Sequence, residues 1–357
     1  IGSGALNTQN LTTATDTYNV AIGDSAGLSV TTGVHNTLIG GGAGDALTNS
    51  SHNVALGYNA LGTDTLGAKS TALGRSALGS QNFTTATDAY NTAVGYDAGN
   101  AVTTGLLNTL IGGLAGDALT DADVNVAVGA NALSSDTLGS KSVAIGYKVL
   151  ETQNFTTATD TYNTAVGYGA GAAITTGLYN TLVGGEAGKS LTDVERNVAI
   201  GAFTLDKEEL GQRNTAVGYA ALSTQDFNTA TDAHNTAIGN EAGLNLTTGK
   251  FNVFLGSVSG GNGTITGTHN TGLGMETLYA LTSGTDNVII GYQSGAKITT
   301  GAHNVAVGRE ALETEDTGSA STAIGHLSLR VQNNDALNHN SGLGYQSGVA
   351  ITSGTGN

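Results

Sequence analysis

The chain has 357 residues, of which 55 are glycine, and it contains no proline, cysteine or tryptophan. The missing proline excludes a collagen-like chain, and the missing cysteine excludes a disulfide framework and thiolate metal sites. A net charge of −16 disfavours nucleic acid as a partner, because phosphate binding requires clustered lysine and arginine. No apolar run approaches the ~18 residues that a membrane-spanning helix needs, so we expect no membrane insertion.

A glycine that follows Ile, Leu or Val recurs from Gly23 to Gly344, and we call it the repeat glycine. Its spacing runs 17, 17, 17 and then 21 residues, which gives a super-period of 72 residues. The super-repeats lie near 23–94, 95–166, 167–238 and 239–310, and residues 311–357 are less regular. We therefore expect one repetitive domain over residues 1–357, with a short strand before each repeat glycine, first at 20–22, 37–39, 54–56 and 71–73.

Within each expected strand, the residue before the glycine and the residue two earlier share one face, because side chains alternate along a strand. We expect this face to point inward and its last residue to form the core. The predicted core residues are Ile22, Ile39, Val94, Ile111, Val166, Ile200, Ile238 and Ile290.

The middle residue of each strand would then point outward, yet it is usually alanine and sometimes larger and apolar. An outward apolar column predicts a partner, and the simplest partner is a second copy of the same chain. The predicted subunit seam contains Leu38, Ala93, Leu110, Leu182 and Phe254.

An asparagine stands four residues before the repeat glycine and is replaced only by serine, at Ser70, Ser142 and Ser321. Stacking the turns in register repeats each residue every ~4.8 Å, so asparagine amides can hydrogen-bond along the stack. The predicted asparagine ladder contains Asn19, Asn36, Asn53, Asn91, Asn108 and Asn163.

One turn cannot be stable alone, because burying one Ile or Val contributes ~1.5–3 kcal/mol while ordering each residue costs ~1–2 kcal/mol. Contacts between stacked turns supply the missing stabilisation. The fold class that we predict is therefore all-β, a parallel β-solenoid (β-roll) of about 20 coils of 17 or 21 residues.

Two stretches, "KSVAIGYKVL" at 141–150 and "STAIGHLSL" at 321–329, resemble the "NSVAIG" repeat in the head of trimeric autotransporter adhesins. That resemblance implies a left-handed β-roll and a homotrimer. "YNTAVGYDAG" at 90–99 is similar to repeats in the shafts of long phage tail-fibre and bacterial surface-fibre proteins. The coils of 17 and 21 residues are longer than the usual repeat of the adhesin head.

Two patterns raise the possibility of a metal site. Six histidines lie five residues before a repeat glycine: His35, His52, His234, His269, His303 and His339. Tyrosine, lysine and arginine also occupy this position, so we interpret it as a tolerant strand start. "GGAGD" at 41–45 and "GGLAGD" at 112–117 are similar to a calcium-binding nonapeptide, but the aspartate offset varies and favours ordinary glycine turns. We expect no metal site.

Catalytic patterns are equally weak. "IGDSAG" at 22–27 matches the hexapeptide of acyltransferase helices, which need three hexads per coil where this chain has one. No Ser-His-Asp or paired-carboxylate arrangement stands out, so we expect no enzyme, no catalytic residue and no cofactor. A hexapeptide-type acyltransferase remains the remote alternative.

Four acids recur seven residues after a repeat glycine, at Asp64, Asp136, Glu208 and Glu315. We interpret them as solvated loop residues that keep the protein soluble. Threonine-rich insertions such as "FTTATD" at 83–88 recur once per super-repeat and suggest an alternative function, a carbohydrate-binding solenoid.

The leading hypothesis is a structural fibre or adhesin shaft, located outside the cell, on a cell surface or on a virion. Its expected partner is itself, as a homotrimer that can join end to end into filaments. A host-surface glycan or protein is the expected receptor.

Overall fold

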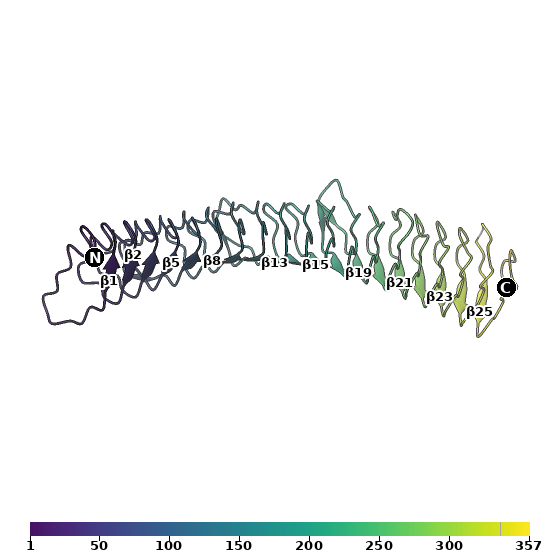
Figure 1. Ribbon diagram of the computed structural model, residues 1–357. Helices are drawn as coiled ribbons and strands as arrows, with labels where there is room; N and C mark the ends of the chain where they lie inside the picture. The colour runs from purple at the N-terminus through teal and green to yellow at the C-terminus, as the bar shows by residue number, and fades with distance from the viewer. Residues whose placement is uncertain (336) are drawn as a thin grey trace. The chain divides into compact units, whose positions relative to one another are not determined.

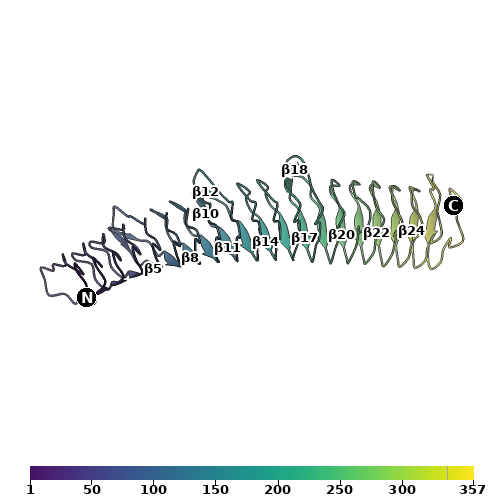
Figure 2. The ribbon, with the colours of Figure 1, turned by 45° about the horizontal axis from the view of Figure 1, so that its top comes forward.

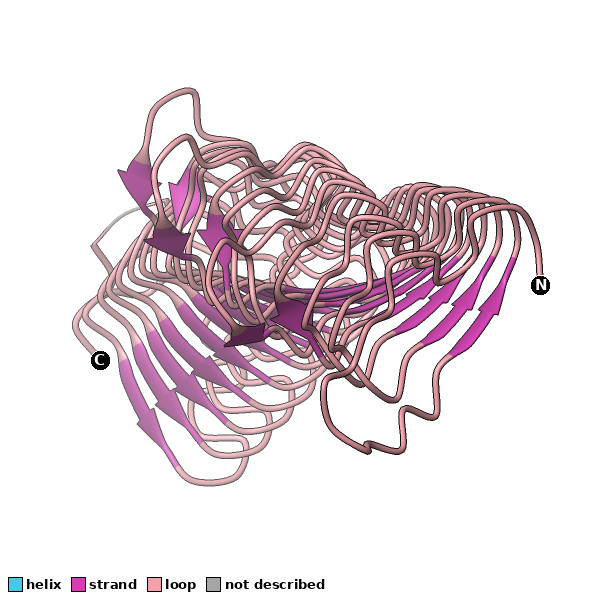
Figure 3. Ribbon diagram, turned by 90° about the vertical axis from the view of Figure 1, so that its left-hand side faces the viewer, coloured by secondary structure: helices cyan, strands magenta, loops and turns pink. Residues whose placement is uncertain are grey.

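The computed structural model describes residues 1–335 and 337–357. The chain consists of two compact units, Ile1–Tyr179 and Asn180–Asn357. Both units are all-β, and the described residues include no helix (Figures 1 and 3). The predicted parallel β-solenoid is confirmed, with about 19 turns instead of about 20.

The first unit stacks three-residue strands in parallel. These strands are β1 (Val20–Ile22), β2 (Thr37–Ile39), β3 (Val54–Leu56), β5 (Thr71–Leu73), β7 (Thr92–Val94), β8 (Thr109–Ile111), β9 (Val126–Val128), β11 (Val143–Ile145) and β13 (Thr164–Val166). Each pairs with the next in strict register, so that Thr92 lies beside Thr109 and Val94 beside Ile111. Two lateral pairs accompany the stack, β4 (Gly67–Ala68) with β6 (Thr87–Asp88) and β10 (Gly139–Ser140) with β12 (Thr159–Asp160).

The second unit repeats this arrangement. Its strands are β14 (Thr181–Val183), β15 (Val198–Ile200), β17 (Thr215–Val217), β19 (Thr236–Ile238), β20 (Val253–Leu255), β21 (Thr271–Leu273), β22 (Val288–Ile290), β23 (Val305–Val307), β24 (Thr322–Ile324) and β25 (Ser341–Leu343). A lateral pair joins β16 (Gly211–Gln212) to β18 (Thr231–Asp232). Figure 2 shows the segments that carry β12 and β18 projecting from the turns of their own units. Each of these insertions therefore forms a short two-stranded sheet with the preceding turn, separate from the main stack.

The two faces of the strands are the reverse of those predicted. The predicted seam residues Leu38, Ala93, Leu110, Leu182 and Phe254 are all fully buried inside the turns, where they form the core. The predicted core residues lie on the outer face: Ile22, Ile111, Ile200 and Ile238 are exposed, and Ile39, Val94, Val166 and Ile290 are half-buried. Both assignments are therefore wrong.

The physical reason is the narrow interior of each turn. The middle residue of the strand packs close to the segment that follows the repeat glycine, so alanine usually fits, and larger residues need glycine beside them. A Cβ atom at Gly116 would lie 2.7 Å from Cδ2 of Leu110, and one at Gly99 would lie 2.6 Å from its Cδ1. The β-branched residues, which favour strands, are left for the wide outer face.

Candidate functional site: outer sheet face and insertion grooves

The outer face of each unit carries two columns of uncharged side chains. The first residue of every stacked strand is Thr, Val or Ser, and the third is Ile, Leu or Val. These side chains are partly open to solvent: Val20 is 46% exposed, Leu56 42% and Leu273 40%. No outward residue of the stacked strands that the structure describes is charged. The face is therefore a continuous uncharged surface along each unit, in which an apolar column of Ile, Leu and Val runs beside a column of Thr, Val and Ser.

A column of rings borders this face at the position five residues before the repeat glycine. The backbone there is left-handed, with φ of 59° at His35 and 63° at His52. The His35 ring stacks on His52 with centroids 4.9 Å apart, and in the second unit Phe251 stacks on His269 at the same distance. At Lys69 the ammonium group takes the place of a ring and lies 5.0 Å from the Tyr90 ring centroid.

The six histidines of this column are all on the surface side of their turns, and none is part of a metal cluster. Among the described residues, no group of three or more His, Cys, Asp and Glu side chains is placed to hold a metal ion. Residues of such different chemistry can share the position because the side chain points outward and is not packed into the interior of the turn.

The asparagine column lies inside the turns, and its hydrogen bonds join each turn to the next. Oδ1 of Asn36 accepts from the backbone N–H of Asn53 at 3.0 Å, and Oδ1 of Asn91 accepts from that of Asn108 at 2.9 Å. Asn36 itself donates its backbone N–H to Oδ1 of Asn19 at 2.8 Å. Nδ2 of Asn163 donates to the Gly177 carbonyl at 2.7 Å. The amides thus satisfy backbone groups at the start of the strands.

Amide-to-amide bonds, which the sequence predicted for the whole column, occur in part of the second unit. There Nδ2 of Asn287 donates to Oδ1 of Asn270 at 2.9 Å, and Nδ2 of Asn270 donates to Oδ1 of Asn252 at 3.1 Å. Asn19 is half-buried, while the other five predicted ladder residues are buried.

The four recurrent acids are not solvated, so that interpretation is wrong. Asp64, Asp136, Glu208 and Glu315 are fully buried. Oδ2 of Asp64 accepts a 2.6 Å bond from Nε2 of Gln81, and its Oδ1 accepts from the backbone N–H groups of Gly67 and Phe83. Burial raises the pKa of the Asp64 and Glu208 carboxyls above their ordinary values.

A sequence signal for this burial exists. A glutamine stands 17 residues after each acid, one turn later at the same position: Gln81, Gln153, Gln225 and Gln332. The next turns place Val102 and Leu119 there, and both are fully buried. An acid at a repeat position that is apolar in other turns, with a glutamine at the same position one turn later, indicates a buried acid–amide pair.

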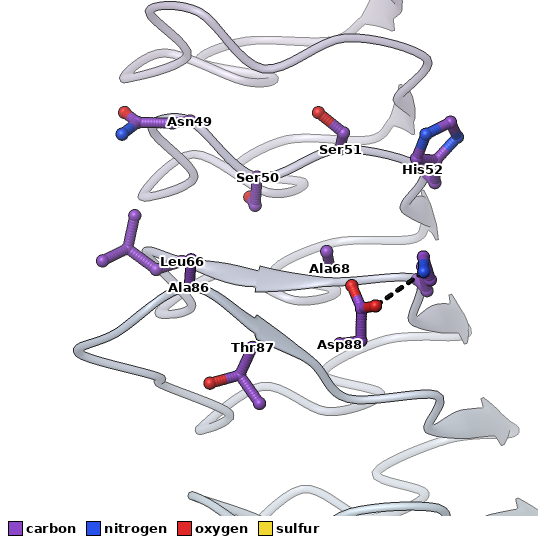
Figure 4. A pocket seen from close by; sticks show the side chains of 10 residues that line it. Asn49, Ser50, Ser51, His52, Leu66, Ala68, Ala86, Thr87 and Asp88 are labelled. Atoms are coloured by element: carbon purple, nitrogen blue, oxygen red, sulfur yellow. Dashed lines mark hydrogen bonds and ion pairs between the residues drawn. The ribbon is translucent and has the colours of Figure 1, made fainter.

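The threonine-rich insertion at 83–88 forms one side of a groove in the first unit. Backbone bonds join Thr48 to Thr65 and Ser51 to Lys69, and between these points the lower turn bulges outward to pair β4 with β6. The space has a volume of about 410 Å³. We call it the first groove; its lining residues are Asn49, Ser50, Ser51, His52, Leu66, Ala68, Lys69, Ala86, Thr87 and Asp88 (Figure 4).

One ion pair closes an edge of the first groove. Lys69 Nζ donates to Asp88 Oδ2 at 2.6 Å and to the Tyr90 hydroxyl at 2.9 Å. These bonds raise the pKa of Lys69 to about 12, so the ammonium group stays charged and is neutralised by its own partner. Equivalent pairs lie at the other insertions, Lys141 with Asp160 and Arg213 with Asp232.

Comparison with models of known protein families and with curated proteins finds no match to this chain. No helix of the described residues has the length and apolarity to cross a bilayer.

Proposed function

We propose that the chain is a structural shaft that associates with copies of itself through the uncharged outer sheet face and its apolar column. The observation that carries this proposal is the absence of charge from every outward position of the stacked strands that the structure describes. Exposed apolar patches larger than a few hundred Å² mark interaction sites in soluble proteins. A face that repeats with every turn suits a partner with the same repeat, which a second copy of the chain supplies.

The charge distribution supports the same reading. The net charge of −16 is carried by residues outside the two uncharged columns, where like charges disfavour contact between copies. Association through the outer face leaves the acidic turns in water. A homotrimer is the assembly we propose, located outside the cell on a cell surface or virion, with attachment to a surface receptor as its role and no catalytic activity. End-to-end joining of such shafts would give filaments.

Light scattering after size exclusion tests this proposal through the mass of the particle. The chain weighs 35.4 kDa, and the proposal expects three chains per particle. Replacing two outward residues of the first unit, Ile111→Lys with Ile145→Lys, places charge on the face and should release monomers. Thr85→Lys, on the exposed insertion, adds charge away from the face and should leave the mass unchanged.

A stable monomer of the native chain at micromolar concentration would contradict self-association. So would a trimer that survives both lysine substitutions, because the outer face would then not be the contact. Circular dichroism of each variant separates loss of association from loss of folding.

A further inference from the structure

The first groove exists because the turn with Asn49, Ser50 and Ser51 is not followed closely by the next turn, in which β4 pairs with β6 of the insertion. In the ordinary turns the equivalent position is glycine, as at Gly33, where an added Cβ would collide with the carbonyl of Ser50. At the insertions the bulge at β4 removes this restriction. The turn there carries side chains instead, namely Ser50 in the first super-repeat, Ala122 in the second and Val194 in the third.

Ser50 is the polar member of this set, and its hydroxyl is unsatisfied. The residue is only 5% exposed, and its Oγ has no hydrogen-bond partner among the described residues. Figure 4 shows the Ser50 side chain turned toward the space above Leu66 and Ala86. A buried hydroxyl without a partner costs free energy, so a ligand group that meets it would be favoured. Ala122 and Val194 present no such atom.

The other groups around the groove narrow the chemistry of the ligand. Asn49 and Ser51 also line the groove, and their oxygens already accept hydrogen bonds from the preceding turn, Oδ1 of Asn49 from the Thr31 hydroxyl and Oγ of Ser51 from the Val34 N–H. The Asn49 amide N–H groups and the Ser51 O–H remain as uncharged donors. Leu66 and Ala86 supply an apolar floor, and the exposed His52 ring lies at one end. The one ion pair present is already neutralised within itself. The groove therefore suits an uncharged molecule that combines hydroxyl groups with an apolar face.

We propose that the first groove binds a neutral sugar residue. A hexose offers hydroxyls that both donate and accept, and a C–H face that can pack on the apolar floor. The volume of about 410 Å³ lies within the range of about 300–1,000 Å³ typical of small-molecule sites. This proposal rests on the groove alone and does not depend on self-association.

The same chain contains two natural counterparts that lack these features. The backbone bonds that bracket the first groove recur at Thr120 with Thr137 and Asp123 with Lys141, and again at Thr192 with Glu209 and Glu195 with Arg213. The upper wall is acidic in both, with Asp121 and Asp123 in one and Asp193 and Glu195 in the other. Carboxylates replace the neutral side chains, and an apolar central side chain replaces Ser50. Asp121 and Asp123 accept hydrogen bonds from the preceding turn, as Asn49 and Ser51 do, but they add negative charge to the wall. We therefore expect one sugar site per chain.

Saturation-transfer NMR and calorimetry on the full chain test the site with methyl glycosides of glucose, galactose, mannose and N-acetylglucosamine. At least one should bind with one site per chain and a dissociation constant on the order of 1 mM. N-acetylneuraminic acid, an anion, should not compete. A neutral-glycan array then separates a terminal sugar of a glycan, which retains the protein, from a free saccharide, which does not.

The chain itself supplies the control variants. Ser50→Ala and the pair Asn49→Asp with Ser51→Asp copy the second super-repeat, where the fold already accepts these residues. Each should weaken binding about tenfold or more, as expected when a hydrogen bond is lost or a wall becomes charged. The reverse triple change, Asp121→Asn with Ala122→Ser and Asp123→Ser, should raise the stoichiometry from one to two sites.

Three results would overturn the proposal. The first is no saturation transfer to any neutral glycoside at tens of millimolar. The second is binding that Ser50→Ala and the double aspartate variant leave unchanged, which would place the sugar elsewhere. The third is preferential binding of the anionic sugar.

Discussion

Gln81 donates a 2.6 Å hydrogen bond from Nε2 to Oδ2 of Asp64 in the interior of the first unit, where both residues are fully buried. The same glutamine donates to Oγ of Ser70 and accepts from Nδ2 of Asn91. All of these partners are neutral, so desolvation of the carboxylate is the larger influence, and it raises the pKa of Asp64.

This raised pKa predicts how stability changes with pH. The folded state binds the Asp64 proton more tightly than the unfolded chain, whose carboxyl has the ordinary value of 3.8. The contribution to stability is therefore fully present below that value and is lost as pH rises through the folded-state pKa. Relative to Asp64→Asn, the native protein should lose free energy of unfolding as pH rises above the ordinary pKa of 3.8, as measured by urea denaturation. Leu110→Ala, which removes no titrating group, should keep the native slope, and a flat difference for Asp64→Asn would contradict the prediction.

The neighbours Leu110 and Ile111 test which face of the strand is the core. Leu110 is fully buried and Ile111 is 38% exposed. Leu110→Ala should lower the free energy of unfolding by about 2–5 kcal/mol, because it leaves a cavity. Ile111→Ala should cost less than about 1.5 kcal/mol when both changes are made in an Ile145→Lys background, which places charge on the outer face and keeps Ile111. Equal losses in denaturant titrations would contradict the observed orientation.

The adjacent glycines Gly112 and Gly113 test the close approach of successive turns. Gly112 has φ of 136°, and an added Cβ would lie 2.5 Å from the carbonyl oxygen of Gly129. Gly113 has nothing within 4 Å of an added Cβ. We expect Gly112→Ala to cost about 3 kcal/mol or more from strain and collision, and Gly113→Ala to change stability by less than about 1 kcal/mol. Thermal melting of the two variants side by side decides this, and a tolerated Gly112→Ala would be inconsistent with the structure.

The asparagine column should be equally sensitive. Asn108 accepts from the backbone N–H of Asn125 at 2.9 Å and donates to the carbonyl of Ala122 at 2.7 Å. Asn108→Ala leaves both buried groups without partners and should cost roughly 2 kcal/mol or more. Amide hydrogen exchange of the Asn125 N–H should accelerate in the variant. Unchanged exchange would show that another group can replace the amide.

The repeat itself could be predicted because each turn imposes the same requirement on the same position. The collision at Gly112 and the backbone donor that meets Asn91 recur in turn after turn, so the sequence shows glycine and asparagine at fixed spacing. Period two also placed the first and third strand residues on one face correctly.

The orientation of that face could not be read from hydrophobicity, because both faces are apolar. Leu110 and Ile111 differ in burial for a geometric reason, the width left by Gly99 and Gly116, which appears only when the turn is closed. The first groove was missed for a similar reason. It depends on where β4 leaves the turn above it, and no single residue type marks that divergence.

The 17-residue step from each buried acid to its glutamine has a consequence for how the chain folds. Successive turns are so alike that a stack shifted by one turn would bury nearly the same apolar columns. Such a shift would place Val102 beside Asp64 in place of Gln81. The buried carboxylate would then lose the hydrogen bond that Gln81 donates to it. The acid–amide pairs therefore favour one alignment of the turns. A shifted alignment would pack its apolar residues equally well, but it would be destabilised by the unpaired buried carboxylates.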